Sequence, residues 1–158
     1  MQKITSWLWF DTRAEEAANF YTSVFANSRI LEISRFGDAG PRPAGEVMTV
    51  SFELDGQQFA ALNGGPEFTF SEAISFQVAC ESQAEVDRFW AALTADGGQE
   101  SQCGWLKDKF GVSWQIVPTA LGEILGDPDP GRARRATEAM LKMTKLDIAA
   151  LRRAADAG

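Results

Sequence analysis

The order of secondary-structure signals along this 158-residue chain repeats once, and the repeat limits the folds open to it. Residues 4–10 are rich in aromatic and branched side chains and stop at Asp11, which predicts a strand that leads into a helix. Small and aromatic residues then recur at helical intervals over about residues 13–25. Thr12 and Glu15 have the spacing of a capping box at the start of this helix.

Three strands complete the first half of the repeat. Apolar and mostly polar residues alternate in one of them, and Asp55-Gly56 is a strong hairpin signal directly after it. The predicted strands cover residues 29–36, 47–54 and 57–62.

The second half follows the same order. Residues 73–80 predict a strand, and Ser82 with Glu85 forms another capping box that opens a helix. A weak strand at 99–103 and a hairpin at 105–118 follow, with a charged, solvated turn in the hairpin. We interpret the chain as a degenerate duplication of a strand–helix–three-strand unit.

The character of the chain changes after Pro118. Apolar residues at helical spacing predict helices over residues 131–145 and 146–155, the second capped by Asp147. Because we expect that this tail cannot bury its apolar stripe alone, it should either cover the sheet or pack on a second subunit. We favour the second alternative, a homodimer contact.

Composition narrows the partners and the compartment. With 45% hydrophobic residues the chain can bury one substantial core. Its 15 basic and 22 acidic residues give a net charge of -7, which opposes binding to nucleic acid or anionic membranes. No apolar run approaches the length of a membrane span, and the N-terminus lacks the apolar stretch of a secretory signal. We therefore expect a cytoplasmic protein.

The residue types that are missing exclude several kinds of chemistry. The chain has no histidine, so serine and cysteine triads and histidine metal sites are ruled out. Its two cysteines, Cys80 and Cys103, form no CxxC motif, and we expect both to be buried, reduced thiols.

Four segments carry a family resemblance: residues 8–21, 62–68, 74–78 and 105–118. They closely resemble the PhnB-like family, often labelled 3-demethylubiquinone-9 3-methyltransferase domain. That family belongs to the vicinal oxygen chelate superfamily of glyoxalases, extradiol dioxygenases and bleomycin-resistance proteins. The resemblance implies an α+β fold in which paired βαβββ modules form a curved mixed sheet around a ligand cup, followed by C-terminal helices.

The resemblance also implies domain boundaries. It gives a vicinal oxygen chelate domain at residues 1–118, with modules at about 3–63 and 73–118, and a helical extension at 119–158.

Metal-using members of the superfamily bind an ion on the first and last strand of each module. The resemblance places these positions on Ser6, Ala61 or Asn63, Ser75 and Gln115. Neutral serine and glutamine are weak ligands for a first-row divalent metal, so we expect that the metal site is lost and that no cofactor is bound. An oxygen-rich alternative would use Glu53, Asn63 and Gln115.

Strand alternation extends this to a predicted ligand surface. If Ser6 faces the cup, so do Leu8 and Phe10; if Ser75 and Gln115 face it, so do Gln77, Ser113 and Val117. The predicted ligand-binding residues are Ser6, Phe10, Thr49, Ser51, Asn63, Ser75, Gln77, Trp105 and Gln115.

Three functions remain open. The one that we favour is a small-molecule binding protein of the glyoxalase/bleomycin-resistance type, with Phe10 and Trp105 as stacking surface. The alternative is a metal-independent lyase or isomerase acting on a small carbonyl or aromatic substrate, with Glu53 as general base. Glu53 also fits a solvated strand end beside the Asp55-Gly56 turn.

A ubiquinone-related methyltransferase follows from the family label alone. A nucleotide-type cofactor fold needs a glycine-rich turn from a strand into a helix. Gly64 and Gly65 are instead followed by Pro66 and a strand-like segment.

Overall fold

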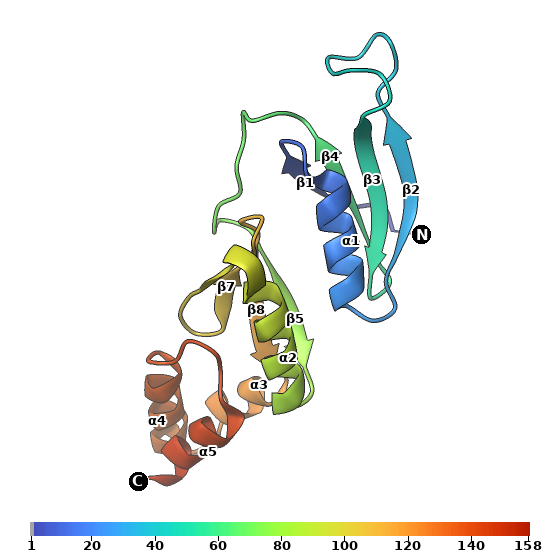
Figure 1. The fold of residues 1–158 in the computed structure, drawn as a ribbon. Coiled ribbons are helices and arrows are strands. Elements are labelled where there is room, and N and C mark those ends of the chain that lie inside the picture. Colours follow the sequence, from blue (N-terminus) through green and yellow to red (C-terminus); the bar gives the residue numbers. More distant parts are fainter. Residues whose placement is uncertain (1) are drawn as a thin grey trace. The chain divides into compact units, whose positions relative to one another are not determined.

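The computed structural model describes residues 2–158 and divides the chain into two compact units, Met1–Phe70 and Ser71–Gly158. Each unit has its own four-stranded mixed sheet with one helix packed against it (Figure 1). The strand orders are β1-β4-β3-β2 in the first sheet and β5-β8-β7-β6 in the second. The two predicted βαβββ modules are therefore present, followed by helices, in an α+β fold.

The first module contains β1 (Ser6–Phe10), α1 (Ala14–Val24), β2 (Arg29–Arg35), β3 (Val47–Leu54) and β4 (Gln57–Asn63). β1 pairs with β4 in parallel, and the other pairs are antiparallel. The core lies between α1 and the sheet, where Tyr21 of α1 contacts the Phe52 ring and Phe52 stacks on Phe59. Burial of these aromatic side chains holds the helix on one face of the sheet.

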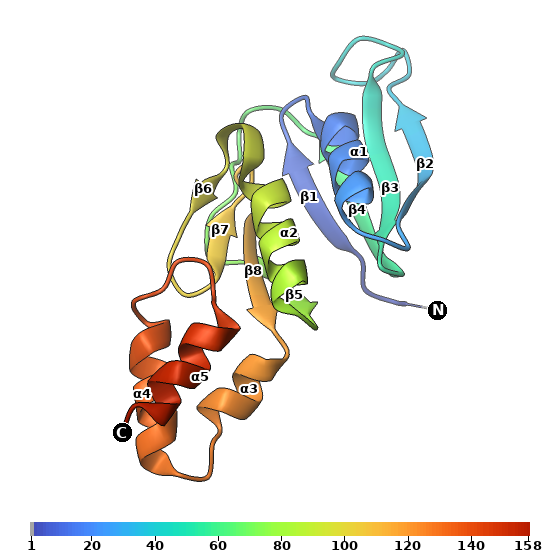
Figure 2. The same ribbon diagram turned by 60° about the horizontal axis from the view of Figure 1, so that its bottom comes forward.

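The second module contains β5 (Ser75–Cys80), α2 (Gln83–Thr94), a short 3₁₀ helix η1 (Ala95–Gly97), β6 (Gln99–Glu100), β7 (Trp105–Lys107) and β8 (Ser113–Pro118). α2 covers one face of the sheet, and Figure 2 shows it in front of β5 and β8. The buried residues Val86, Phe89, Trp90 and Leu93 lie on this helix. β6 is shorter than predicted because residues 101–104 form a turn.

The two helices begin differently. The Ser82 hydroxyl accepts a hydrogen bond from Glu85 N at 3.2 Å, which confirms the predicted N-cap of α2. The predicted capping box of α1 is wrong, because the N-cap position is Arg13 and its side chain makes no capping bond. The cap of α1 comes from a distant strand.

The tail forms three helices, α3 (Ala120–Leu125), α4 (Pro130–Met140) and α5 (Ile148–Asp156), of which α3 was not predicted. Asp147 caps α5 as predicted, since its side chain accepts a hydrogen bond from Ala150 N at 2.9 Å. Ile124, Ala136, Leu151 and Ala155 form a buried cluster between the helices. The expectation that the tail cannot bury its apolar stripe alone is therefore wrong for most of the stripe, although Leu141 is 57% exposed. The predicted homodimer contact stays a prediction.

No helix within residues 2–158 combines the length and the apolar character needed to cross a bilayer.

Candidate functional site

The face of the second sheet that α2 does not cover carries a row of three side chains from neighbouring strands. We call it the second helix-free face. Side chains alternate between the two faces along each strand, and Phe76, Trp114 and Ile116 lie on the face that packs against α2. The opposite positions pair across the strands, with Gln77 beside Gln115 and Gln115 beside Trp105. An indole and two amides therefore share one row.

A second row lies next to the first and contains Ser75, Ser113 and Lys107. Gln115 Nε2 donates a hydrogen bond to Ser75 Oγ at 2.8 Å, so the two rows are linked. The Ser113 hydroxyl is buried, with the residue 1% exposed, and it has no hydrogen-bond partner among residues 2–158. An unsatisfied buried hydroxyl is costly, which marks this position as unusual.

Lys107 ends the second row with a charge that is already paired. Its Nζ lies 2.7 Å from Glu72 Oε1. The hydrogen bond from Lys107, together with its positive charge, lowers the pKa of the Glu72 carboxyl. The second helix-free face is therefore polar rather than strongly charged.

Asp108 stabilises the turn that joins β7 to β8. Its Oδ1 accepts hydrogen bonds from Phe110 N at 2.8 Å and Val112 N at 3.1 Å, and its Oδ2 accepts one from Trp114 Nε1 at 2.9 Å. The residue is only 3% exposed. The expectation of a solvated turn is wrong at this residue, because the buried carboxylate accepts hydrogen bonds from three donors.

The first sheet corrects the predicted orientation of β1. Ser6 pairs with Phe59 and Leu8 with Ala61, and both partners lie on the face that α1 covers. Ser6, Leu8 and Phe10 therefore lie on the helix side, and the prediction that they face a ligand cup on the other side of the sheet is wrong. Phe10 is 5% exposed and packs edge-on against Phe70 at 5.3 Å.

Trp7 and Trp9 take the positions that had been expected for Ser6 and Phe10. They pair with Ala60 and Leu62 on the first helix-free face, and Trp7 is 57% exposed. Both parities of β1 are largely apolar, so alternation could not separate them.

Trp9 is fixed by the segment that follows β4. Its Nε1 donates a hydrogen bond to Gly65 O at 2.9 Å, and its ring meets Phe68 edge-on at 4.9 Å. A side chain at Gly64 would place a Cβ 2.4 Å from the Trp9 ring. Gly64 thus allows the close approach of the Trp9 indole.

That role replaces any phosphate-binding turn, because the segment after the glycines enters β5 and not a helix. The local structure gives no support to the methyltransferase label.

Asn63 has a structural role. Its Oδ1 accepts a hydrogen bond from Ala14 N at 2.9 Å, which caps α1, and its Nδ2 donates to Val47 O at 3.0 Å. The side chain lies on the helix side, and the residue is 8% exposed. Both amide atoms are used, so we leave Asn63 out of the candidate ligand surface.

Three further predicted residues lie on β3, on the first helix-free face. The Thr49 hydroxyl is hydrogen-bonded to Ser34, and Ser51 is half-buried. Glu53 Oε2 lies 3.2 Å from Arg29 Nε at the strand end. This ion pair occupies the Glu53 carboxylate and does not favour its use as a general base.

The residues do not fit a divalent metal site of the superfamily type. Within residues 2–158, no three or more histidine, cysteine, aspartate or glutamate side chains gather in a way that could hold an ion. Ser75 and Gln115 bond to each other through neutral groups, and Ser6 lies on the helix side. A carboxylate, imidazole or thiolate would be needed for firm binding.

Residues 2–117 match the family model described as 3-demethylubiquinone-9 3-methyltransferase. The chain belongs to this PhnB-like family. A PhnB protein from Bacillus cereus, titled a putative 3-demethylubiquinone-9 3-methyltransferase, is 40% identical over 75% of this chain and 100% of its own, with a TM-score of 0.68. This is the family that the four segments predicted.

More distant structures share the fold. Protein PA1353 from Pseudomonas aeruginosa is 22% identical over 75% of this chain and 98% of its own, with a TM-score of 0.61. The fosfomycin resistance protein FosX from Listeria monocytogenes is 15% identical over 77% of this chain and 94% of its own, with a TM-score of 0.52. No curated protein matches the chain.

Proposed function

We propose that this PhnB-like protein binds a planar small molecule on the second helix-free face without a metal ion. The observation that carries the proposal is the row of Trp105, Gln115 and Gln77 across three strands. An aromatic face beside amide donors and acceptors suits a flat ligand that has polar atoms at its edge.

The polar pattern supports a neutral or weakly polar ligand. The Gln115 amide group donates one hydrogen bond to Ser75, and its carbonyl oxygen can still accept a hydrogen bond from a ligand. The Ser113 hydroxyl lies in the adjacent row without a partner among the described residues, so a small shift that opened it would add a donor and acceptor. Lys107 is held by Glu72, which removes the obvious anchor for an anion.

The first helix-free face offers a second aromatic surface through Trp7, which is well exposed. Trp9 is held in place by Gly65 and Phe68, so this surface is rigid at one point.

Titration with N-phenyl-1-naphthylamine, a neutral planar fluorophore, tests the proposal. We expect saturable binding that weakens about threefold to tenfold in Trp105→Ala, the range for loss of one aromatic contact. Ile74→Ala is the control, because Ile74 is an exposed apolar residue of the same unit, 74% exposed.

Binding that is absent, or equally weakened in both variants, would contradict the proposal. A larger loss of affinity in Trp7→Ala than in Trp105→Ala would indicate that the ligand binds the first helix-free face instead.

A further inference from the structure

The C-terminal helices lie outside the part of the chain that defines the family. The family model ends at residue 117, and the whole Bacillus cereus relative is covered by 75% of this chain. In this chain, however, α3, α4 and α5 belong to the same compact unit as the second sheet. What they contact therefore bears on properties that the family domain does not explain.

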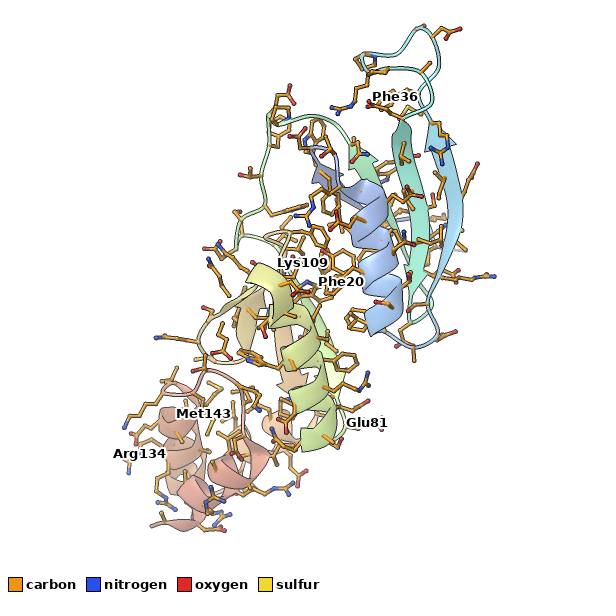
Figure 3. The ribbon with its side chains drawn as sticks, viewed as in Figure 1. Phe20, Phe36, Glu81, Lys109, Arg134 and Met143 are labelled. Atoms are coloured by element: carbon orange, nitrogen blue, oxygen red, sulfur yellow. The ribbon has the colours of Figure 1, made fainter. Side chains whose placement is uncertain are left out.

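The segment between α4 and α5 is bonded to the turn that precedes Trp105. Cys103 N donates to Met143 O and Gly104 N donates to Thr144 O, both at 2.8 Å. Cys103 Sγ lies 3.6 Å from Met140 O as a further weak donor. Met143 is labelled in Figure 3 on this segment, which runs beside the turn in both ribbon views (Figures 1 and 2).

The turn needs such support, because its backbone is unusual. Cys103 has φ +59° and Gly104 has φ +85°, so two successive residues are in the left-handed region. A residue with a Cβ is disfavoured there and persists only where its surroundings fix it. Three of the turn's hydrogen bonds go to tail carbonyl oxygens.

The same turn leads directly into the candidate ligand surface. Gly104 O accepts a hydrogen bond from Ile116 N at 2.7 Å, and Trp105 N donates to Gln102 O at 3.1 Å. A displacement of the turn would therefore be passed to Trp105 through one peptide bond.

Gln83 of α2 holds the tail from the other side. Its Nε2 donates to Leu146 O at 3.0 Å and its Oε1 accepts from Ile148 N at 2.8 Å. Next to it, Lys145 Nζ lies 2.8 Å from Asp87 Oδ1. Leu146, between these contacts, is fully buried and lies against Gly104.

We propose that the C-terminal helices are a brace that fixes Trp105 for ligand binding, with Gln83 and Leu146 as positioning residues. Because the helices have a core of their own, they can act as one body against the turn. The proposal rests on the proposed function only for its effect on affinity; the effect on Trp105 itself needs no ligand.

Fluorine NMR of the full-length protein labelled with 5-fluorotryptophan tests the brace. Five resonances are expected from the five tryptophans, each assigned by a Trp→Phe variant. In a Gln83→Ala/Lys145→Ala double variant we expect the Trp105 resonance to shift or broaden while Trp90 and Trp114 stay unchanged, since both are buried in the module core.

Two measurements complete the test. Gln102→Ala, an exposed glutamine in the same turn, should leave all five resonances in place. The double variant should bind N-phenyl-1-naphthylamine about threefold to tenfold more weakly, the range expected when a large side chain must be immobilised on binding.

An unmoved Trp105 resonance in the double variant overturns the brace, and so does a joint shift of all five resonances. If the fluorophore fails to bind the unaltered protein, the proposed function fails, and the resonances alone decide the brace.

Discussion

In the first module the helix-free face carries Trp7 and Trp9 beside Leu62, whereas in the second it carries Trp105 beside Gln115 and Gln77. Both faces belong to sheets with the same strand order. The helix side of each sheet is fixed by core packing, while the opposite positions are free to change. The comparison teaches that one duplicated scaffold can carry two tryptophans on the helix-free face of one half, and one tryptophan with two glutamines on that of the other.

The turns of the last hairpin in each module should differ most. Asp108→Asn should lower the free energy of unfolding by about 2–4 kcal/mol, because an amide group replaces a buried carboxylate that accepts three hydrogen bonds. Asp55→Asn in the first module should change it by less than about 0.5 kcal/mol, since Asp55 is exposed. Urea unfolding followed by circular dichroism measures both, and equal losses would contradict the buried role of Asp108.

The helix caps give the next contrast. Asn63→Ala should cost about 2–3 kcal/mol, because it removes the cap of α1 and leaves Val47 O without its donor. Ser82→Ala removes only a local cap of α2 and should cost about 1 kcal/mol. The same urea experiment compares them. A smaller effect at Asn63 than at Ser82 would show that the long-range cap is dispensable.

A glycine precedes a strand in each module, Gly56 before β4 and Gly104 before β7, but only Gly104 lies against the C-terminal tail. Gly56 and Gly104 have φ of +78° and +85°, so alanine is strained at both. Only at Gly104 would the new Cβ lie 3.0 Å from Ile116 O and Leu146 Cδ1. Gly104→Ala should therefore lower the free energy of unfolding by about 1–2 kcal/mol more than Gly56→Ala does. Equal effects in thermal unfolding would argue against the contact between tail and turn.

The smallest expected effect concerns the ion pair of the second module. Since Lys107 lowers the pKa of Glu72, the pair stabilises the fold above the ordinary carboxyl pKa of 4.5, and this contribution is lost as the pH falls through the lowered value. In a carbon-13 NMR titration the Glu72 carboxyl should have its midpoint below 4.5, and Lys107→Met should restore it. A midpoint that does not respond to Lys107→Met would contradict the pairing.

Features set by neighbouring residues could be predicted from the sequence. The order of the sheet-forming elements and the caps by Ser82 and Asp147 follow from local spacing. The family follows from four short segments.

Features set by distant partners could not be predicted in the same way. The Asn63 cap joins residues 49 positions apart, and no local pattern identifies its partner. On β1 both parities are apolar, so only the pairing with β4 decides that Trp7 and not Ser6 faces away from α1. The tail forms its own core because α3, which was not predicted, supplies Ile124. Each of these errors comes from tertiary contacts that override a local pattern.

The central claim is that the second helix-free face binds a planar ligand without a metal ion. Titration of the purified protein with N-phenyl-1-naphthylamine, before and after treatment with EDTA, tests it most directly. The account predicts saturable binding with the same dissociation constant in both states. Loss of binding after EDTA that is restored by a divalent metal ion would contradict it.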